Sequence, residues 1–389
     1  SVDCDKFSEG FFSLKDATII KENSEVLSQK FFNLMGEMTA AKAAEFQPDL
    51  ILALAQAPLS PEAIIRLKDL NIPIAFWFVE DFRTLVYWKE VSPVYDHFFT
   101  IQNGEFHSNL NAEGVKDAYY LPQAAYTPIH RPLNLTLSKK NKYKADISFM
   151  GAAYHNRVQS FPRLLDKNFK IWGTGWNPDT VLGKRLQNNN KRVTTAETVN
   201  IYNASKINLN LHSSSCHYGI NPEGDFVNPR TFEIAACKGF QLVDYRSDLI
   251  NLFHINDEIT VFRSLDEMKD QIDFYLNNPD LREIISKRSY QRVLNEHTIV
   301  HRMQEMLIHI FINRLKSLES TQENKVDPLA YCISKAGENT DLGKYLKGFK
   351  GEKNFSLKTM ANKIQNGEGA LEDNETLIMM IDQLMEEKA

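Results

Sequence analysis

Short apolar runs alternate with amphipathic segments along most of the chain, which is the pattern of parallel sheets covered by helices on both faces. We interpret nine of these runs as buried strands: 50–54, 73–79, 97–101, 119–122, 145–150, 169–172, 206–211, 240–243 and 258–262. Helices are expected between them, and two longer helices are expected over 279–296 and 298–318. The pattern therefore predicts an α/β protein with two Rossmann-like domains.

Polar stretches divide the chain. Residues 127–144 carry two prolines and a lysine-rich run, so we expect a linker between a first domain over 1–126 and a second over 145–320. Residues 321–389 begin with a polar hinge and predict three short amphipathic helices without strands.

The first domain is expected to form one doubly wound unit with a helix over 28–45 in front of it.

Composition narrows the function classes. The chain has 389 residues, 43% of them hydrophobic and 24% charged, with a formal net charge of −5, so no global basic field favours nucleic acid or an anionic membrane. The four cysteines are far apart and form no CxxC pair, which favours a reducing compartment. No apolar run approaches the ~20 residues of a membrane span, and the first residues lack a signal-peptide pattern. We therefore expect a cytoplasmic protein.

The segment 228–239 predicts a helix with signals at both ends. Asn228 suits the N-cap and Pro229 the first helical position, and Gly239 is expected to supply the left-handed residue that ends the helix. Such an N-terminus favours anions, and Arg230 and Thr231 lie in its first turn. This helix is a candidate site for a nucleotide diphosphate and its ribose.

Glu233 lies one turn further along the same helix. It could form only an exposed i,i+3 pair with Arg230, which contributes a few tenths of a kcal/mol. Its neighbours are nearly all apolar or small, however, which predicts a largely buried helix, and a buried carboxylate needs partners. We favour a ligand-binding role for Glu233.

The second domain opens with a strand that runs into a glycine loop and then a helix, over 149–157. Ligands bind at the carboxyl ends of strands in open α/β sheets, so Gly151, His155 and Arg157 are donor-binding candidates. The alternative is a plain strand-to-helix turn with a surface arginine. Gly173 and Gly175 stand between two tryptophans after the next strand, either as a loop on which a base or sugar stacks or as a tight turn held by aromatic packing.

Glu80 and Asp81 follow a strand of the first domain, and one of them could act as a general base. The alternative for Asp81 is helix capping. Metal-binding patterns are weak: His212, Cys216 and His217 lie close together and His297 and His301 are four apart, but neither group has a HExxH frame. The DxD triplet at residues 3–5 has no strand ahead of it, and no GxSxG motif indicates a serine hydrolase.

Taken together, six segments resemble the bacterial glycosyltransferases of the CgeB/spore-maturation type, a group similar to the group 1 (GT-B) glycosyltransferases. The resemblance covers roughly residues 48–315, and the segments that carry it are 48–51, 77–81, 146–151 with Arg157, 172–176, 228–237 and 296–298 with His301 and Arg302. It implies a GT-B fold with a C-terminal helical extension, in which two Rossmann-like domains face a cleft. It also implies a first strand with a glycine loop, which is not obvious before residue 48, so either Val2–Ile20 is a divergent version of it or the chain begins inside the domain.

The resemblance also implies roles for two carboxylates separated by seven residues. Glu233 would hold the donor ribose, and Asp225 stands where the sugar-facing carboxylate would be. Asp225 is shorter than the usual glutamate, and Lys238 interrupts the family's Cys-Gly pair.

The resemblance implies transfer of a sugar from a nucleotide-sugar donor to a hydroxyl of a glycan or protein, without a metal ion or cofactor. A UDP-sugar is the favoured donor. A nucleotide-sugar epimerase of the same fold and a non-catalytic scaffold, with 321–389 as its docking module, are the alternatives.

Overall fold

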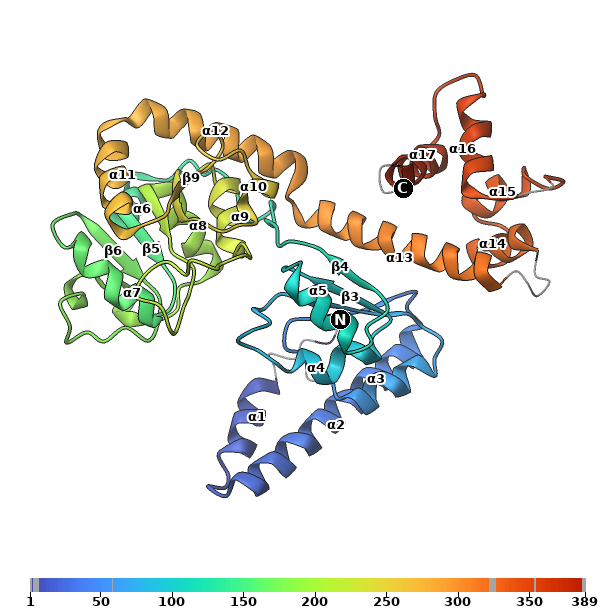
Figure 1. Ribbon diagram of the computed structural model, residues 1–389, viewed down its shortest axis with the longest axis horizontal. Helices are drawn as coiled ribbons and strands as arrows, with labels where there is room; N and C mark the ends of the chain where they lie inside the picture. Colours follow the sequence, from blue (N-terminus) through green and yellow to red (C-terminus); the bar gives the residue numbers. More distant parts are fainter. Residues whose placement is uncertain (1, 3–6, 58, 322–326, 353–354, 387–389) are drawn as a thin grey trace. The chain divides into compact units, whose positions relative to one another are not determined.

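The computed structural model describes residues 2, 7–57, 59–321, 327–352 and 355–386 (Figure 1). The chain divides into two compact units, residues 1–303 and 304–389. The division falls inside the long helix α13 (Ile299–Thr321), whereas the sequence pattern places the start of the C-terminal part at residue 321. In the described residues, no helix combines the length and the apolar character that crossing a membrane requires.

The first unit contains two parallel sheets, and all nine predicted strands are present within two residues of their expected ends. The first sheet has the order β1-β2-β3-β4. Its strands are β1 (Ile51–Leu54), β2 (Ile74–Phe78), β3 (His97–Thr100) and β4 (Ala118–Tyr120). Every position of β2 is buried, as expected for a strand covered on both faces.

The first sheet is not the doubly wound unit expected from the sequence, because its strands follow one another in a single direction. The described part of the chain before β1 forms two helices, α1 (Ser8–Lys15) and α2 (Lys21–Phe46), so the interpretation of Val2–Ile20 as a divergent strand is wrong. Helix α2 packs on α3 (Pro61–Lys68) through Gly36, where a Cβ would lie 2.4 Å from the Cβ of Ala63. Two further helices, α4 (Trp88–Val91) and α5 (Glu105–Ala112), complete this domain.

The polar stretch 127–144 is partly ordered as a helix. Helix α6 (Leu137–Tyr143) begins at Thr136, whose hydroxyl accepts from the N–H of Lys139, and its last residue, Tyr143, is buried.

The second sheet has the order β6-β5-β7-β8-β9. Its strands are β5 (Ala145–Met150), β6 (Phe169–Trp172), β7 (Ser205–Asn210), β8 (Gln241–Asp244) and β9 (Thr260–Phe262). The order reverses between β5 and β7, and ligands of open α/β sheets bind at the carboxyl ends of the strands at such a point. The fold therefore directs attention to the residues that follow β5 and β7.

Helices cover both faces of this sheet. One face packs against the segments of α7 (His155–Ser160), α11 (Leu265–Asn277) and α12 (Pro279–Glu296), and the other against α8 (Thr195–Ala204) and α9 (Pro229–Ala236). A short helix, α10 (Leu249–Leu252), follows β8. The chain then returns beside the first domain, where the N–H of Ala125 donates to the carbonyl of His297 and the N–H of Ile299 donates to that of Ala125.

The predicted caps of α9 are confirmed at its start and corrected at its end. The Asn228 side chain accepts from the N–H of Thr231, as an N-cap does. At the other end Lys238, not Gly239, takes the left-handed conformation, with φ of 57°. Gly239 instead allows the backbone to pack closely against Asn208, because a Cβ at Gly239 would lie 2.9 Å from Nδ2 of Asn208.

The second unit contains four short helices in its described residues, one more than the sequence analysis predicts. They are α14 (Pro328–Ala336), α15 (Asp341–Lys347), α16 (Leu357–Gln365) and α17 (Asp373–Glu386). The first two are separate because Gly337 has φ of +84° and the Thr340 hydroxyl caps a new helix at Gly343. Apolar residues of all four form one small core.

Candidate active site

Two guanidinium groups converge on the glycine that follows β5. A Cβ at Gly151 would lie 3.1 Å from Nη1 of Arg157 and 3.2 Å from Nη2 of Arg230. Arg157 comes from α7, and Arg230 from the first turn of α9. Both planes lie near the ring of Phe149, at 5.1 Å and 5.8 Å. Three segments of the second domain thus bring two positive charges to the carboxyl end of β5.

Arg157 is not the surface arginine of the alternative interpretation, because only 4% of it is exposed. Its Nε and Nη2 donate to the carbonyl of Leu211, and its Nη1 donates to that of Ala152. Burial, followed by the charge of Arg230, lowers the pKa of Arg157 to about 9, which still leaves the group charged at neutral pH. Three of its five N–H groups are engaged, so two remain to meet an anion.

The start of α9 is tied to the end of β7 by Asn210, which is fully buried. Its Nδ2 donates to the hydroxyl of Thr231 and to Oδ1 of Asn228, while its Oδ1 accepts from Nη1 of Arg230. The side chains of Asn228 and Thr231 therefore hold the helix start in place. Arg230 is the residue of this turn that is directed toward Gly151.

Glu233 is partly buried, with 24% of its side chain exposed. The hydroxyl of Tyr202 donates to Oε2 of Glu233 over 3.3 Å, and Nε2 of His130 lies 3.9 Å from Oε1. Burial, and then the charge of Glu233, raise the pKa of Tyr202 well above its ordinary value. The carboxylate is therefore held by neighbours from α8 and from the segment before α6, on the same helix as Arg230.

The loop after β6 supports the Gly151 turn through its backbone. A Cβ at Gly173 would lie 2.0 Å from the carbonyl oxygen of Gly151, and Gly175 has φ of +76°. The indole N–H of Trp176 donates to the same Gly151 oxygen over 3.0 Å, and its ring stacks on Phe161. The geometry favours the tight turn held by aromatic packing.

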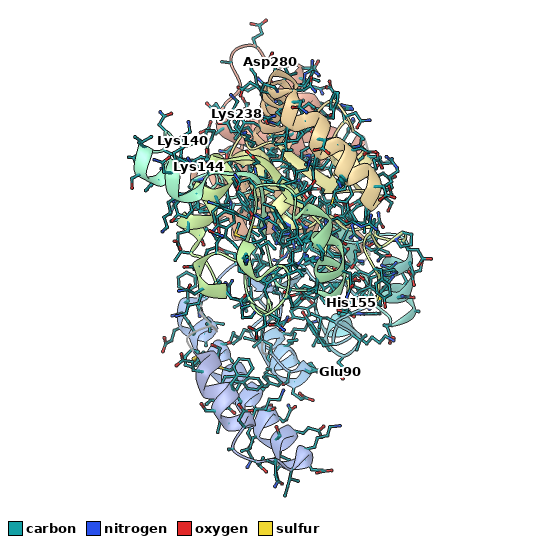
Figure 2. The ribbon with its side chains drawn as sticks, turned by 90° about the vertical axis from the view of Figure 1, so that its left-hand side faces the viewer. Glu90, Lys140, Lys144, His155, Lys238 and Asp280 are labelled. Atoms are coloured by element: carbon teal, nitrogen blue, oxygen red, sulfur yellow. The ribbon has the colours of Figure 1, made fainter. Side chains whose placement is uncertain are left out.

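His155 begins α7, and its ring meets the edge of Tyr218 at 4.9 Å. Figure 2 shows His155 well separated from Lys140, Lys144, Lys238 and Asp280, which lie toward the opposite edge of the domain. A groove of about 350 Å³ lies at that opposite edge, beside Lys238 and Arg282. It contains none of the predicted site residues, because it lies at the amino ends of the strands.

Asp225 contacts the first domain. Its Oδ2 accepts from Nη1 of Arg83 over 3.1 Å, and its Oδ1 accepts from Nε2 of Gln102 over 2.9 Å. The same Gln102 amide lies 3.3 Å from Oδ1 of Asp81. One glutamine thus bridges the carboxylate that the resemblance assigns to the sugar and the carboxylate that the sequence suggests as a base.

Asp81 does not cap a helix, since the next helix, α4, begins only at Trp88; its Oδ1 accepts from the N–H of Arg83 in the turn that follows β2. Glu80 lies apart from this cluster and accepts from Nε2 of Gln56. The fold therefore brings Asp81 and Asp225 together from the two domains, and Arg83 brings Glu105 to the same cluster through its Nη2.

Several residues of this site were not predicted. They are Asn210, Arg83, Gln102, Tyr202 and His130. The position of Asn210 at the end of a predicted strand was a usable signal, since polar residues there lie at the binding edge of a sheet. The others depend on contacts between residues far apart in sequence, such as the separation of 142 between Arg83 and Asp225.

The described residues contain no group of three or more His, Cys, Asp or Glu side chains that could hold a metal ion. His212 is paired with Asp244, and His217 with the hydroxyl of Ser214. His297 contacts the carbonyl of Leu252, and His301 the hydroxyl of Thr298. The DxD triplet at residues 3–5 lies outside the described residues.

Comparisons with known proteins agree with this fold. Residues 154–308 match the protein-family model described as glycosyl transferase-like. The chain is 25% identical over 266 residues to spore protein CgeB of Bacillus subtilis (strain 168). The aligned region covers 65% of this chain and 80% of CgeB.

Two solved structures share the fold at low sequence identity. Sucrose-phosphate synthase from Thermosynechococcus elongatus has a TM-score of 0.52 at 11% identity, with 74% of this chain and 80% of that chain covered. Anabaena HepE in complex with UDP and glucose has a TM-score of 0.50 at 9% identity, with 80% and 84% covered.

The resemblance to CgeB-type proteins is therefore confirmed, and so is the GT-B fold with its C-terminal helices. The chain is a glycosyltransferase.

Proposed function

We propose that this enzyme transfers a sugar from a nucleotide diphosphate sugar to a hydroxyl of a glycan or protein, and that the transfer needs no metal ion. A UDP-sugar is the leading candidate for the donor. The observation that carries the proposal is the convergence of Arg157 and Arg230 on Gly151 at the carboxyl end of β5. Two guanidinium groups and a helix N-terminus fit a diphosphate, because each supplies positive charge and N–H donors to phosphate oxygens. The structure of HepE, a protein of the same fold, contains UDP and glucose, which supports a UDP-sugar as the first donor to test.

The chemistry follows from where the charges lie. The acceptor oxygen attacks the anomeric carbon of the sugar while the bond from that carbon to the diphosphate oxygen breaks. The departing diphosphate gains negative charge beside Arg157 and Arg230, and groups positioned at developing charge lower the barrier. Glu233, three residues after Arg230, would accept from the ribose hydroxyls. These groups perform the task that a divalent cation performs in metal-dependent enzymes, so we propose that no metal is needed.

The acceptor proton needs a base, and we assign this role to Asp81. Its position beside Gln102, which also donates to Asp225, places it where the two domains meet. Asp81→Asn tests the assignment, because asparagine retains an oxygen for the N–H of Arg83 but removes the base. Turnover should fall at least 100-fold with unchanged UDP affinity, in the range usual for general bases. Normal turnover in Asp81→Asn would exclude the role.

The test of the donor class is a thermal-shift panel of UDP-, GDP-, dTDP- and CMP-sugars, with and without EDTA. A ligand at ~100 times its Kd stabilises a protein by about 2.7 kcal/mol, or roughly 5 °C or more for a domain of this size. We expect one nucleotide class to raise the melting temperature, equally with EDTA present. Glu233→Ala should abolish the shift, whereas Glu113→Ala, at an exposed position of the first domain, should retain it. No shift with any donor, or a shift that requires metal, would contradict the proposal.

A further inference from the structure

Three ionisable side chains are buried together behind the donor site. Asp244 ends β8 and is fully buried, and His212 and Arg246 are 1% and 2% exposed. Since isolated ionised groups are costly to bury, each must be compensated by a specific partner.

The hydrogen bonds fix the state of His212. The main-chain N–H of Asn228 donates to Nε2 of His212 over 2.9 Å, so Nε2 carries a lone pair and no proton. The proton is therefore on Nδ1, which donates to Oδ1 of Asp244 over 2.7 Å. Burial lowers the pKa of His212 to about 4, although Asp244 opposes this, so the ring is neutral. His212 thus links Asp244 to the N-cap residue of α9.

Arg246 links the same carboxylate to the loop before α9. Its Nη2 donates to Oδ2 of Asp244 over 2.7 Å. Its Nη1 lies against Gly224, where a Cβ would be only 1.6 Å away. The chain beside Arg246 is also bound to this loop, because the N–H of Ser247 donates to the carbonyl of Gly224 and that of Asp248 donates to the carbonyl of Asp225.

We propose that Asp244, which binds His212 through one oxygen and Arg246 through the other, positions both ends of the segment that carries Asp225 and Glu233, the two carboxylates proposed to bind the donor. His212 fixes Asn228, the start of α9 and hence Arg230 and Glu233. Arg246 fixes Gly224 and hence Asp225. These three act through Asn228, Gly224 and Asp225, so we assign them a positioning role, and the inference rests on the proposed function.

A purely stabilising role is a weaker account of the network. Well-packed apolar residues often replace a buried ion pair at no cost in stability, so burial of this ion pair and the neutral imidazole adds little that a Leu or Met could not supply. What apolar residues cannot supply is a directed acceptor for the N–H of Asn228 and a flat surface for Gly224. The geometry therefore points to placement of the donor segment.

Two substitutions of His212 separate placement from stability. In His212→Gln the side-chain amide reaches the position of Nε2 and can accept from Asn228, whereas in His212→Asn it reaches only the position of Nδ1. We expect His212→Asn to raise the Kd for UDP about tenfold and His212→Gln to raise it less than threefold, at similar losses of melting temperature. Equal UDP affinities in the two variants would overturn the inference.

Arg246→Lys gives an independent test, because it alters the support of Asp225 and leaves that of Glu233. The Kd for UDP should stay within threefold of the wild type while kcat with a UDP-sugar falls about tenfold or more. Unchanged kcat would overturn this arm. If the wild-type protein itself does not bind UDP, the proposed function fails, and the two failures are thereby distinguished.

A measurement on the wild type covers the case in which these variants do not fold. The imidazole ¹⁵N spectrum at neutral pH should show His212 as the neutral tautomer with its proton on Nδ1. A cationic ring, or a proton on Nε2, would overturn the inference, because Asn228 would then have no acceptor.

Discussion

The guanidinium pair at Gly151 predicts that one substitution will have opposite effects on the empty and the nucleotide-bound protein. Arg157 Nη1 and Arg230 Nη2 each lie within 3.2 Å of the position that a Cβ at Gly151 would take, so the two nitrogens are at most about 6 Å apart. At an effective dielectric constant of about 20, two unit charges at that separation repel each other by about 3 kcal/mol. Arg230→Met removes this repulsion and also removes the 3.2 Å hydrogen bond to Asn210, worth about 1 kcal/mol. The empty protein should therefore be as stable as the wild type or more stable by about 1–2 kcal/mol.

Nucleotide binding should change in the other direction. A hydrogen bond from a charged donor contributes about 1.5–3 kcal/mol, so Arg230→Met should weaken UDP binding by about 10- to 150-fold. Arg230→Lys, which retains the charge but not the planar fork, should lie between the two.

Calorimetric titration with UDP and thermal denaturation of the empty protein measure the two effects. Arg163→Met is the matched control, because Arg163 is an exposed arginine paired with Asp266, and it should alter neither quantity appreciably. A less stable empty protein with unchanged UDP affinity would refute the reasoning, since Arg230 would then be a structural residue.

Three further predictions concern the support of the site and the buried histidines. Gly173→Ala should lower stability by about 2–4 kcal/mol in urea denaturation, because its Cβ would meet the Gly151 oxygen at 2.0 Å; a change under 0.5 kcal/mol would contradict the close approach. Trp176→Phe should cost about 2 kcal/mol by the same assay and weaken UDP binding a few-fold, since the bond to Gly151 is lost and the smaller ring leaves part of the core space empty; unaltered binding would argue against that support. His212 and His297 have pKa values of about 4 in the folded protein, so the unfolded state binds more protons between about pH 6.5 and 4. The free energy of unfolding should therefore decrease as the pH is lowered, by about 2 kcal/mol per histidine from pH 8 to pH 5. A urea midpoint that stays constant over this range would be evidence against neutral rings.

The sheet framework was predictable from the sequence because buried parallel strands leave continuous apolar runs bounded by turns. The N-cap of α9 was also predictable, because its signal is local: Asn228 and Pro229 stand at the start of the helix. Its C-terminal end was not, because Lys238 adopts a left-handed conformation at a cost of roughly 1–2 kcal/mol that surrounding packing must offset.

Part of the candidate site was predicted from the sequence, and its arrangement was not. Gly151, Arg157, Arg230 and Glu233 follow from the loop-and-helix pattern and the family resemblance, yet nothing local indicates that Arg157 is buried on main-chain carbonyls. The contact of Asp225 with Gln102 is likewise tertiary, across 123 residues. Helix α1 lies within Val2–Ile20, where a divergent strand was one alternative, because its residues contain no β-branched run, whereas α2 includes the predicted helix over 28–45.

The central claim is that the carboxyl edge of the second sheet binds the diphosphate of the donor. The most direct test is a crystal structure of the protein with UDP. We expect phosphate oxygens within hydrogen-bond distance of Arg157 and Arg230, beside Gly151, and ribose hydroxyls at Glu233. UDP bound elsewhere, for example in the groove beside Lys238 and Arg282 at the opposite edge of the domain, would contradict it.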